Sequence, residues 1–467
     1  MAIFVDVEDL FNYARGNPRP SGIQRLAFQI QRELWVSLRD TDGLRFVRHA
    51  GRDNNPLLWE VPWTTIDALF AQLARSPPEP TTRSSALSRG DSWFRQARRL
   101  FGQVALRMPG PVCEPLLQSW SFHREALQQF KELQRVMRIR PRKSNLPEAA
   151  SAESTEAAMS VGDVFLVLGA PWVYADFAGL LSALRNRHGV RPALLLYDLI
   201  PLLRPEWCAR DLVARFSPTL MKALPLCDSL MAISNYTATQ VEQWAARTGV
   251  RLNGPIRPVP IGTGFGEEPA PVGATLGLPR PGSYVLFVST LEARKNHALL
   301  VRVWRRLLEE EFAGKRLAGS VPELVFAGRV GWLVDDLMRQ LDNSSWLDGR
   351  VRLLRDPSDA ELRALYEGAL FSIFPSLYEG WGLPVTEALS FGVPVLCSSA
   401  TALPEAGGDL ARYFDPEDAG DCCRAVAALI DDRAELEAWR ADVRARFRPT
   451  PWSATARAVL AEGLAAI

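Results

Sequence analysis

Short apolar runs alternate with helical patterns along most of the chain. In the first half, runs typical of buried strands occur at residues 3–7, 163–169, 192–197 and 229–233. Apolar positions spaced three and four residues apart predict helices between them, as at 22–35 and 176–187. This alternation of strands and helices is typical of an α/β domain built on a parallel sheet.

The same alternation returns in the second half. Strands are predicted at residues 284–289, 322–327, 351–354, 370–374 and 394–398, with a helical pattern after each. A segment rich in proline and glycine, 267–281, is the expected hinge between the halves. We therefore expect an α/β protein with two Rossmann-like, doubly wound domains, 1–266 and 282–448, facing each other across a cleft at the carboxyl ends of their strands. An Ala-rich amphipathic helix at 449–467 is expected to pack back on the first domain.

Two segments depart from this pattern. Residues 12–21 are polar and predict a loop, and residues 60–155 are predicted to form a helical and basic insert in the first domain. Within the insert, residues 84–108 place Trp and Phe at helical spacing among arginines. Such a helix either lies on an anionic membrane surface or packs on the protein with its arginines in water.

Composition narrows the function classes. A net charge of +1 and 47% hydrophobic residues describe an ordinary globular protein, with no charge excess that points to nucleic acid. The six cysteines form no CxxC pair and the four histidines show no metal-ligand spacing, so we expect free thiols and no metal. The N-terminus lacks the basic segment of a signal peptide and no apolar run reaches 18 residues, which predicts a cytoplasmic protein, at most peripheral at a membrane face.

The stretch 374–394 carries the most chemistry. It predicts a strand, a glycine-containing turn and a helix that opens at Pro384, with Glu379 before the helix and Glu387 within it. A helix N-terminus beside a strand end favours anions, because its amide groups lack partners and the helix dipole is positive there. Two carboxylates beside an anion site suit a ligand with phosphates and hydroxyls, such as a nucleotide sugar. The alternative is a capped helix with two solvated glutamates.

The motifs around this stretch resemble those of a known enzyme family. They are the E-x7-E pattern from Glu379 to Glu387, the strand at 392–396, the loops at 403–408 and 414–416, and the segment 287–296. Over about 280–460 the chain resembles the retaining glycosyltransferases of family 4, which have the two-domain GT-B architecture. A Gly-rich segment at 262–266 does not indicate a dinucleotide site, because no helix follows it.

The resemblance implies roles for individual residues. Glu387 would hold the donor ribose, Glu379 would contact the transferred sugar, and the backbone of Gly382 and Leu383 would lie near the diphosphate. Arg294 and Lys295 would stabilise the leaving diphosphate, as their charge also suggests.

The first domain and the phosphate loop would supply further contacts. Gly22 would face the cleft, and Arg25 would meet acceptor or phosphate or would lie on the helix surface. Where many relatives have an arginine, Ser289 and Thr290 stand here, which leaves open what completes the phosphate clamp. Where relatives often have His-Asp, this chain has Tyr197-Asp198, so Asp198 either takes a charge role or is a loop acid.

The resemblance also implies the reaction. It would be transfer of a sugar with retention, without a metal cofactor, from a nucleotide sugar to a saccharide or lipid-linked saccharide in bacterial surface polysaccharide synthesis. Mannose from GDP-mannose is the expected donor group, because the Thr-Leu-Glu-x-Arg-Lys-Asn loop at 290–296 is similar to that of bacterial mannosyltransferases. UDP- or dTDP-sugars remain alternatives, as does a catalytically weak GT-B sugar-binding protein.

Overall fold

A computed structural model describes residues 1–17, 19–49, 57–74, 158–264 and 277–465. The described residues before and after the segment 75–157 together form one compact unit. The predicted helix at 84–108, and most of the predicted hinge at 267–281, lie outside the described residues.

The first sheet has the strand order β3-β2-β1-β4-β5-β6-β7. Its strands are β1 (Ile3–Asp6), β2 (Leu44–His49), β3 (Leu58–Glu60), β4 (Val164–Val167), β5 (Arg191–Leu196), β6 (Ser229–Ala232) and β7 (Arg257–Pro258). All neighbours are parallel except β2 and β3. The described helices of this part are α1 (Glu8–Gly16), α2 (Gly22–Leu38), α3 (Trp63–Ala74), α6 (Phe177–His188), α7 (Ile200–Leu203), α8 (Arg210–Ala223) and α9 (Asn235–Thr248).

The second sheet has the order β10-β9-β8-β11-β12-β13, and every pair is parallel. Its strands are β8 (Tyr284–Val288), β9 (Glu323–Ala327), β10 (Val351–Leu354), β11 (Ser372–Phe374), β12 (Val395–Ser398) and β13 (Arg412–Phe414). Its helices are α10 (His297–Phe312), α11 (Asp335–Asn343), α12 (Ser345–Asp348), α13 (Asp359–Gly368), α14 (Leu383–Ser390), α15 (Leu403–Gly407), α16 (Ala419–Asp431) and α17 (Arg433–Arg446). Strand order reverses between β8 and β11, which is where doubly wound sheets bind ligands.

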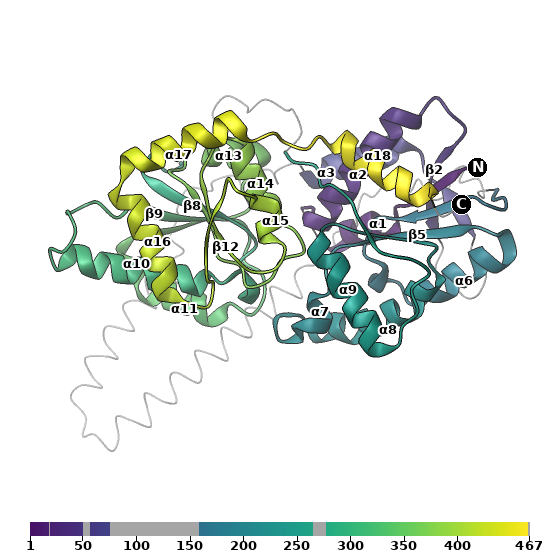
Figure 1. Cartoon of the computed structure of the whole chain (residues 1–467), viewed down its shortest axis with the longest axis horizontal. Coiled ribbons are helices and arrows are strands. Elements are labelled where there is room, and N and C mark those ends of the chain that lie inside the picture. The colour runs from purple at the N-terminus through teal and green to yellow at the C-terminus, as the bar shows by residue number, and fades with distance from the viewer. Residues whose placement is uncertain (18, 50–56, 75–157, 265–276, 466–467) are drawn as a thin grey trace, which may run out of the picture. The chain divides into compact units, whose positions relative to one another are not determined.

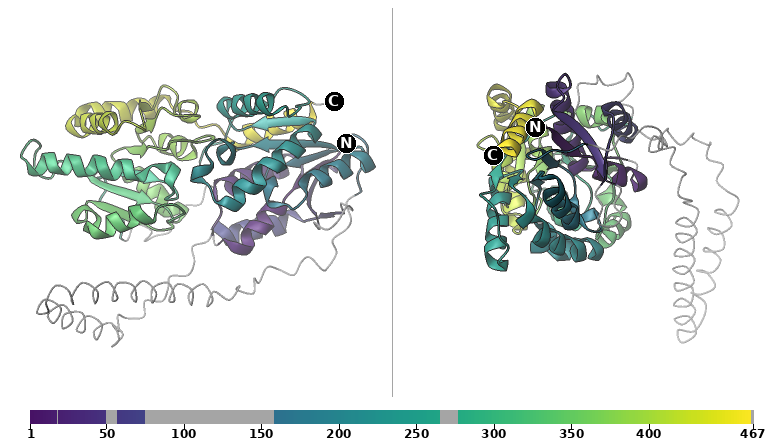
Figure 2. Two further views of the ribbon diagram at one scale, coloured as in Figure 1. Left: turned by 90° about the horizontal axis from the view of Figure 1, so that it is seen from below. Right: turned by 90° about the vertical axis from the view of Figure 1, so that its right-hand side faces the viewer.

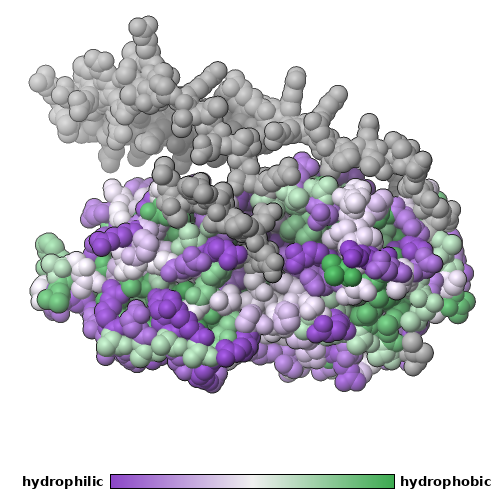
Figure 3. Space-filling model, turned by 90° about the horizontal axis from the view of Figure 1, so that it is seen from above, coloured by the Kyte–Doolittle hydropathy of each residue, from purple (hydrophilic) through white to green (hydrophobic). Residues whose placement is uncertain are grey.

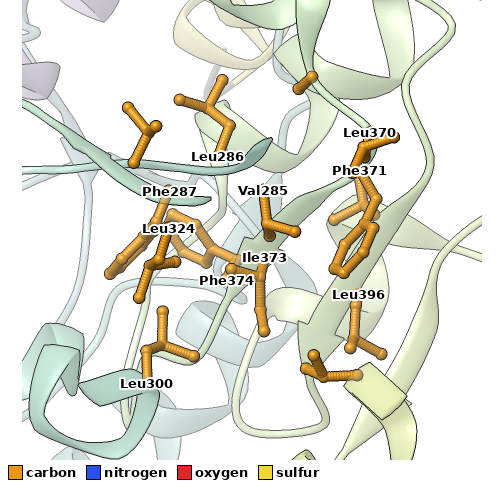
Figure 4. Close-up of a cluster of buried hydrophobic side chains, with 14 of the residues drawn as sticks. Val285, Leu286, Phe287, Leu300, Leu324, Leu370, Phe371, Ile373, Phe374 and Leu396 are labelled. Atoms are coloured by element: carbon orange, nitrogen blue, oxygen red, sulfur yellow. The ribbon is translucent and has the colours of Figure 1, made fainter. Parts of the chain in front are cut away.

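Helices lie on both sides of each sheet, as Figures 1 and 2 show. The strands are therefore buried on both faces, which explains why their sequences are continuous apolar runs rather than alternating ones. In the second sheet, Val285, Phe287 and Ile373 are fully buried and pack with Phe374 and Leu324 (Figure 4). The prediction of two α/β halves with parallel sheets is confirmed.

The chain returns to the first sheet at its end. Helix α18 (Trp452–Leu464), yellow in Figure 1, lies beside α2 and also contacts β6. The Ser229 hydroxyl on β6 donates to the Glu462 carbonyl at 2.9 Å. At Gly262 a Cβ atom would come within 2.3 Å of the Trp452 ring, so the chain crosses this ring where only glycine fits.

Some local predictions were wrong. The predicted loop at 12–21 is in part helical, because α1 begins at Glu8, with two acidic residues in its first turn where the helix dipole favours them. Strand β2 was missed; in its sequence LRFVRH only Leu44, Phe46 and Val47 are buried, so it forms no continuous apolar run.

The described surface is mixed in character. On the face drawn in Figure 3, hydrophilic residues are interspersed with smaller hydrophobic groups. Among the described residues, no helix is both long and apolar enough to cross a membrane. The five cysteines in this part of the chain are free, as expected.

Candidate active site

A cleft of about 470 Å³ lies at the carboxyl ends of strands from both sheets. Its wall includes the start of α2, the loops after β5 and β8, and the turn that leads from β11 into α14. All ten residues that the sequence singled out line this cleft: Gly22, Arg25, Asp198, Thr290, Arg294, Lys295, Glu379, Gly382, Leu383 and Glu387. Folding therefore brings together residues up to 365 positions apart (22 to 387).

Glu379 lies between the two cations of the β8–α10 loop. Its Oε1 is 2.5 Å from Lys295 Nζ and its Oε2 is 2.8 Å from an Arg294 guanidinium nitrogen. Arg294 also donates to the Tyr378 carbonyl at 2.9 Å. Glu379 is 8% exposed, so the alternative of a solvated glutamate on a capped helix does not hold for it.

Burial and charge compete in this cluster. Burial by itself raises the pKa of Glu379, but Arg294 and Lys295 outweigh it and hold this pKa below its ordinary value. The pKa of Lys295 is lowered by burial and by the neighbouring Arg294 guanidinium. Arg294 also pairs with the buried Glu292 at 3.2 Å, so two carboxylates balance the two cations. Bringing an anionic group beside the cluster would favour the charged form of Lys295.

Glu387 lies within α14, beyond the turn that carries Glu379. The Tyr366 hydroxyl donates to its Oε2 at 3.0 Å. Burial raises the pKa of Glu387 to about 7, against the opposing influence of Arg25 and Tyr366. Arg25 itself pairs with Asp359 at 2.8 Å, so the structure places it beside Glu387 but bound to another carboxylate.

Asp198 and Tyr197 form the wall contributed by the loop after β5. The Tyr197 hydroxyl donates to the Leu168 carbonyl at 2.6 Å, so this side chain is anchored in the fold. Asp198 Oδ1 accepts the Ile200 amide at 2.9 Å at the start of α7, and burial raises the Asp198 pKa. At Gly380 a Cβ atom would come within 2.1 Å of the Tyr197 carbonyl oxygen, which requires glycine at this approach.

The turn before α14 places its backbone on the cleft wall. Gly382 is the N-cap residue and Leu383 the first residue of the helix, and Pro384 occupies the second position rather than the predicted first. Helix α2 likewise begins at Gly22, which also lines the cleft. Both helix starts offer amide groups and a positive dipole end to an anion.

Several cleft residues were not recognised from the sequence. They are Arg19, Glu292, Arg329, Trp332 and Asp356. Arg329 and Asp356 each follow the carboxyl end of a strand, β9 and β10, so strand-end position was the available signal. Within the described ranges, no group of three or more His, Cys, Asp or Glu side chains could hold a metal ion.

Residues 274–446 match the family model of glycosyl transferases group 1. This range contains the ion-paired loop, Glu379, Glu387 and α14. The match covers 173 of the 467 residues of the chain. The matched residues include the second sheet and its side of the cleft, whereas the first sheet lies outside the matched range.

Relatives with described activities match part of this chain. An O-antigen chain mannosyltransferase B of Escherichia coli is 37% identical over 163 residues, 35% of this chain and 40% of that protein. The serotype-specific mannosyltransferase WbdA of Escherichia coli is 28% identical over 249 residues, 51% of this chain and 29% of that protein. The chain thus spans less than half of the length of these relatives.

Solved structures match over nearly the whole length. Sucrose-phosphate synthase from Thermosynechococcus elongatus superposes with a TM-score of 0.53 at 18% identity, covering 98% of this chain and 96% of that one. Anabaena HepE in complex with UDP and glucose gives a TM-score of 0.54 at 14% identity and covers 100% of both chains. The fold is GT-B.

Proposed function

We propose that this protein is a retaining glycosyltransferase that transfers a sugar from a nucleotide donor to a saccharide. The observation that carries the proposal is the Arg294–Glu379–Lys295 cluster at the point where strand order reverses, beside the start of α14. A diphosphate leaving group needs cations and amide donors at such a place. The group 1 glycosyltransferase match to residues 274–446 supports the same chemistry.

The roles follow from position. Arg294 and Lys295, with the Gly382 and Leu383 backbone, would hold the diphosphate, and Glu387 would accept the ribose hydroxyls. Glu379 would keep the two cations in place and contact the transferred sugar. Thr290, Gly22 and Arg25 would border the donor, and Asp198 faces the same space from the first sheet.

Mannose from GDP-mannose is the donor group that we favour, because the matched Escherichia coli proteins are mannosyltransferases. UDP- and dTDP-sugars are the alternatives. The acceptor would be a saccharide or lipid-linked saccharide of a bacterial surface polysaccharide, and the reaction would need no metal cofactor, so a chelator should leave turnover unchanged.

Two assays test the proposal. Thermal unfolding with GDP, UDP and dTDP identifies the nucleotide, since only a bound ligand stabilises the fold by mass action. Transfer from the corresponding nucleotide sugar is then compared among wild type, Glu387→Ala and Lys295→Ala. We expect Glu387→Ala to lose donor binding and Lys295→Ala to lose about 10²-fold in turnover. Unchanged turnover in both variants would refute the roles, and nucleotide binding without transfer or hydrolysis would favour the sugar-binding alternative.

Membrane contact through residues 84–108 is a separate proposal, which would place the protein at the inner membrane face. Flotation with anionic liposomes of the whole chain and of a chain lacking 84–108 tests it. Equal flotation of the two would exclude that segment as the contact.

A further inference from the structure

Ser289 and His297 form a hydrogen-bonded pair at the edge of the cleft that the proposed function does not use. Ser289 follows β8 directly and lines the cleft, and its Oγ is 3.2 Å from His297 Nε2. His297 is the first residue of α10 and is only 1% exposed. The pair therefore joins the cleft wall to the interior of the domain.

The imidazole of His297 has apolar surroundings. Its ring lies against Phe287 and Phe326, with centroid distances of 4.5 and 4.8 Å. Burial, reinforced by the charge of Lys295, lowers its pKa to about 3, so the ring is neutral at ordinary pH. Its Nδ1 has no hydrogen-bond partner in the part of the chain that the structure describes, which leaves Ser289 as the polar contact of the ring.

A neutral imidazole carries one N–H, and its position decides what Ser289 can do. If Nε2 is bare, it accepts the Ser289 hydrogen, and the hydroxyl then shows only lone pairs to the cleft. If Nε2 carries the hydrogen, it donates to Ser289 Oγ and leaves the hydroxyl hydrogen free. The second arrangement also leaves Nδ1 as an unpaired acceptor rather than an unpaired donor, and orphaned buried N–H groups are the rarer case.

The backbone of Ser289 is fixed. Its amide donates to the Ala327 carbonyl on β9 at 3.1 Å. Gly328, with φ +153, passes so close that a Cβ atom there would lie 2.0 Å from the Ser289 carbonyl oxygen. The hydroxyl is thus held at the carboxyl end of β8, in the same loop as the two cations.

We propose that His297, as the neutral Nε2–H tautomer, positions the Ser289 hydroxyl to donate a hydrogen bond to a phosphate oxygen of the nucleotide. Phosphate oxygens only accept, so the free hydroxyl hydrogen is the feature that makes the contact. This rests on the proposed function, since it assumes a nucleoside diphosphate in the cleft. It assigns the uncharged part of a phosphate clamp whose charged part is Arg294 and Lys295.

The test compares binding of a nucleoside diphosphate with binding of the nucleoside alone, which lacks the phosphates. Binding of GDP and of guanosine is measured by calorimetry for wild type, Ser289→Ala, His297→Phe and His297→Gln; UDP and uridine replace them if UDP stabilises the wild type better. Ser283→Ala is the matched control, because Ser283 precedes the same strand at its other end and its hydroxyl bonds only to the Arg280 carbonyl among the described groups.

We expect Ser289→Ala and His297→Phe to weaken GDP binding about tenfold, because each loses one hydrogen bond to a charged phosphate group. Guanosine binding should be unchanged, because guanosine has no phosphate. His297→Gln should stay within about threefold of wild type, because the glutamine amide can donate from a position near Nε2. Melting temperatures of all variants identify any that fail to fold. If His297→Phe unfolds, Ser289→Ala still tests the inference, because it removes only one oxygen atom.

Nitrogen-15 spectra of the histidines provide a readout independent of binding. We expect His297 to show a protonated Nε2 and to remain neutral at pH 5. Equal GDP affinity in Ser289→Ala and wild type, an equal loss for guanosine, or a protonated Nδ1 would overturn the inference while leaving the proposed function intact. A wild type that binds no nucleoside diphosphate would refute both.

Discussion

Glu387 makes donor binding depend on pH in a direction that the structure fixes. Its pKa rises from 4.5 to about 7, chiefly because the side chain is removed from water. If the ionised carboxylate accepts the ribose hydroxyls, binding requires loss of this proton. Affinity should then be constant above pH 7 and fall about tenfold for each pH unit well below it, since one pH unit corresponds to 1.36 kcal/mol.

The same proton affects stability with the opposite sign. Between pH 4.5 and about 7 the folded protein holds a proton that the unfolded chain has released. The contribution of Glu387 to the free energy of unfolding is therefore fully present below pH 4.5 and is lost as pH rises through 7. Over the whole pH interval this contribution to the free energy of unfolding changes by about 3 kcal/mol at most. Partial exposure of the Glu387 side chain makes the change smaller.

Calorimetry with a nucleotide sugar between pH 5.5 and 8.5 measures the first effect, because the diphosphate diester does not titrate in this range. Glu387→Gln should bind weakly at every pH and lose the slope, and it should unfold at a higher temperature than wild type at pH 8. Glu367→Gln is the control, since Glu367 is an exposed carboxylate on α13, outside the cleft wall. A slope that persists in Glu387→Gln would refute the assignment of this pH dependence to Glu387.

Three further changes probe the geometry around the cleft. Glu379→Gln leaves the two cations beside it without their shared counter-charge and should cost about 3 kcal/mol in the free energy of unfolding; added pyrophosphate should raise its melting temperature more than that of wild type, and an equal rise would contradict this. Gly380→Ala should cost about 1–3 kcal/mol because the new Cβ would meet the Tyr197 carbonyl oxygen at 2.1 Å, whereas Gly16→Ala, with no atom within 4 Å, should be neutral in urea unfolding. Glu405→Ala removes a carboxylate that accepts three N–H bonds at the start of α9 and should lower stability by about 1 kcal/mol; unchanged unfolding would mean that these bonds contribute nothing.

Sequence periodicity predicted the core elements well where strands are buried on both faces. The runs around 163–169, 284–289 and 322–327 contain β4, β8 and β9, because a continuous apolar segment between polar turns has few other stable environments. It failed at β2 and at α1. The strand β2 has a half-covered pattern that is easily taken for a loop, and α1 is short and rich in polar side chains.

The sequence by itself predicted the two parallel sheets and a cleft at their strand ends, because strand ends of a parallel sheet share one edge. Through its resemblance to a known family it also predicted ten of the residues that line the cleft. Only the tertiary structure decided which of those residues touch. Glu379 meets Arg294 and Lys295 across more than 80 positions, and Ser289 at the cleft wall bonds to a buried imidazole. A hydrophobic pattern reports whether a side chain is buried but not which partner it is buried against, so pairing and the pKa values that depend on it required the folded chain.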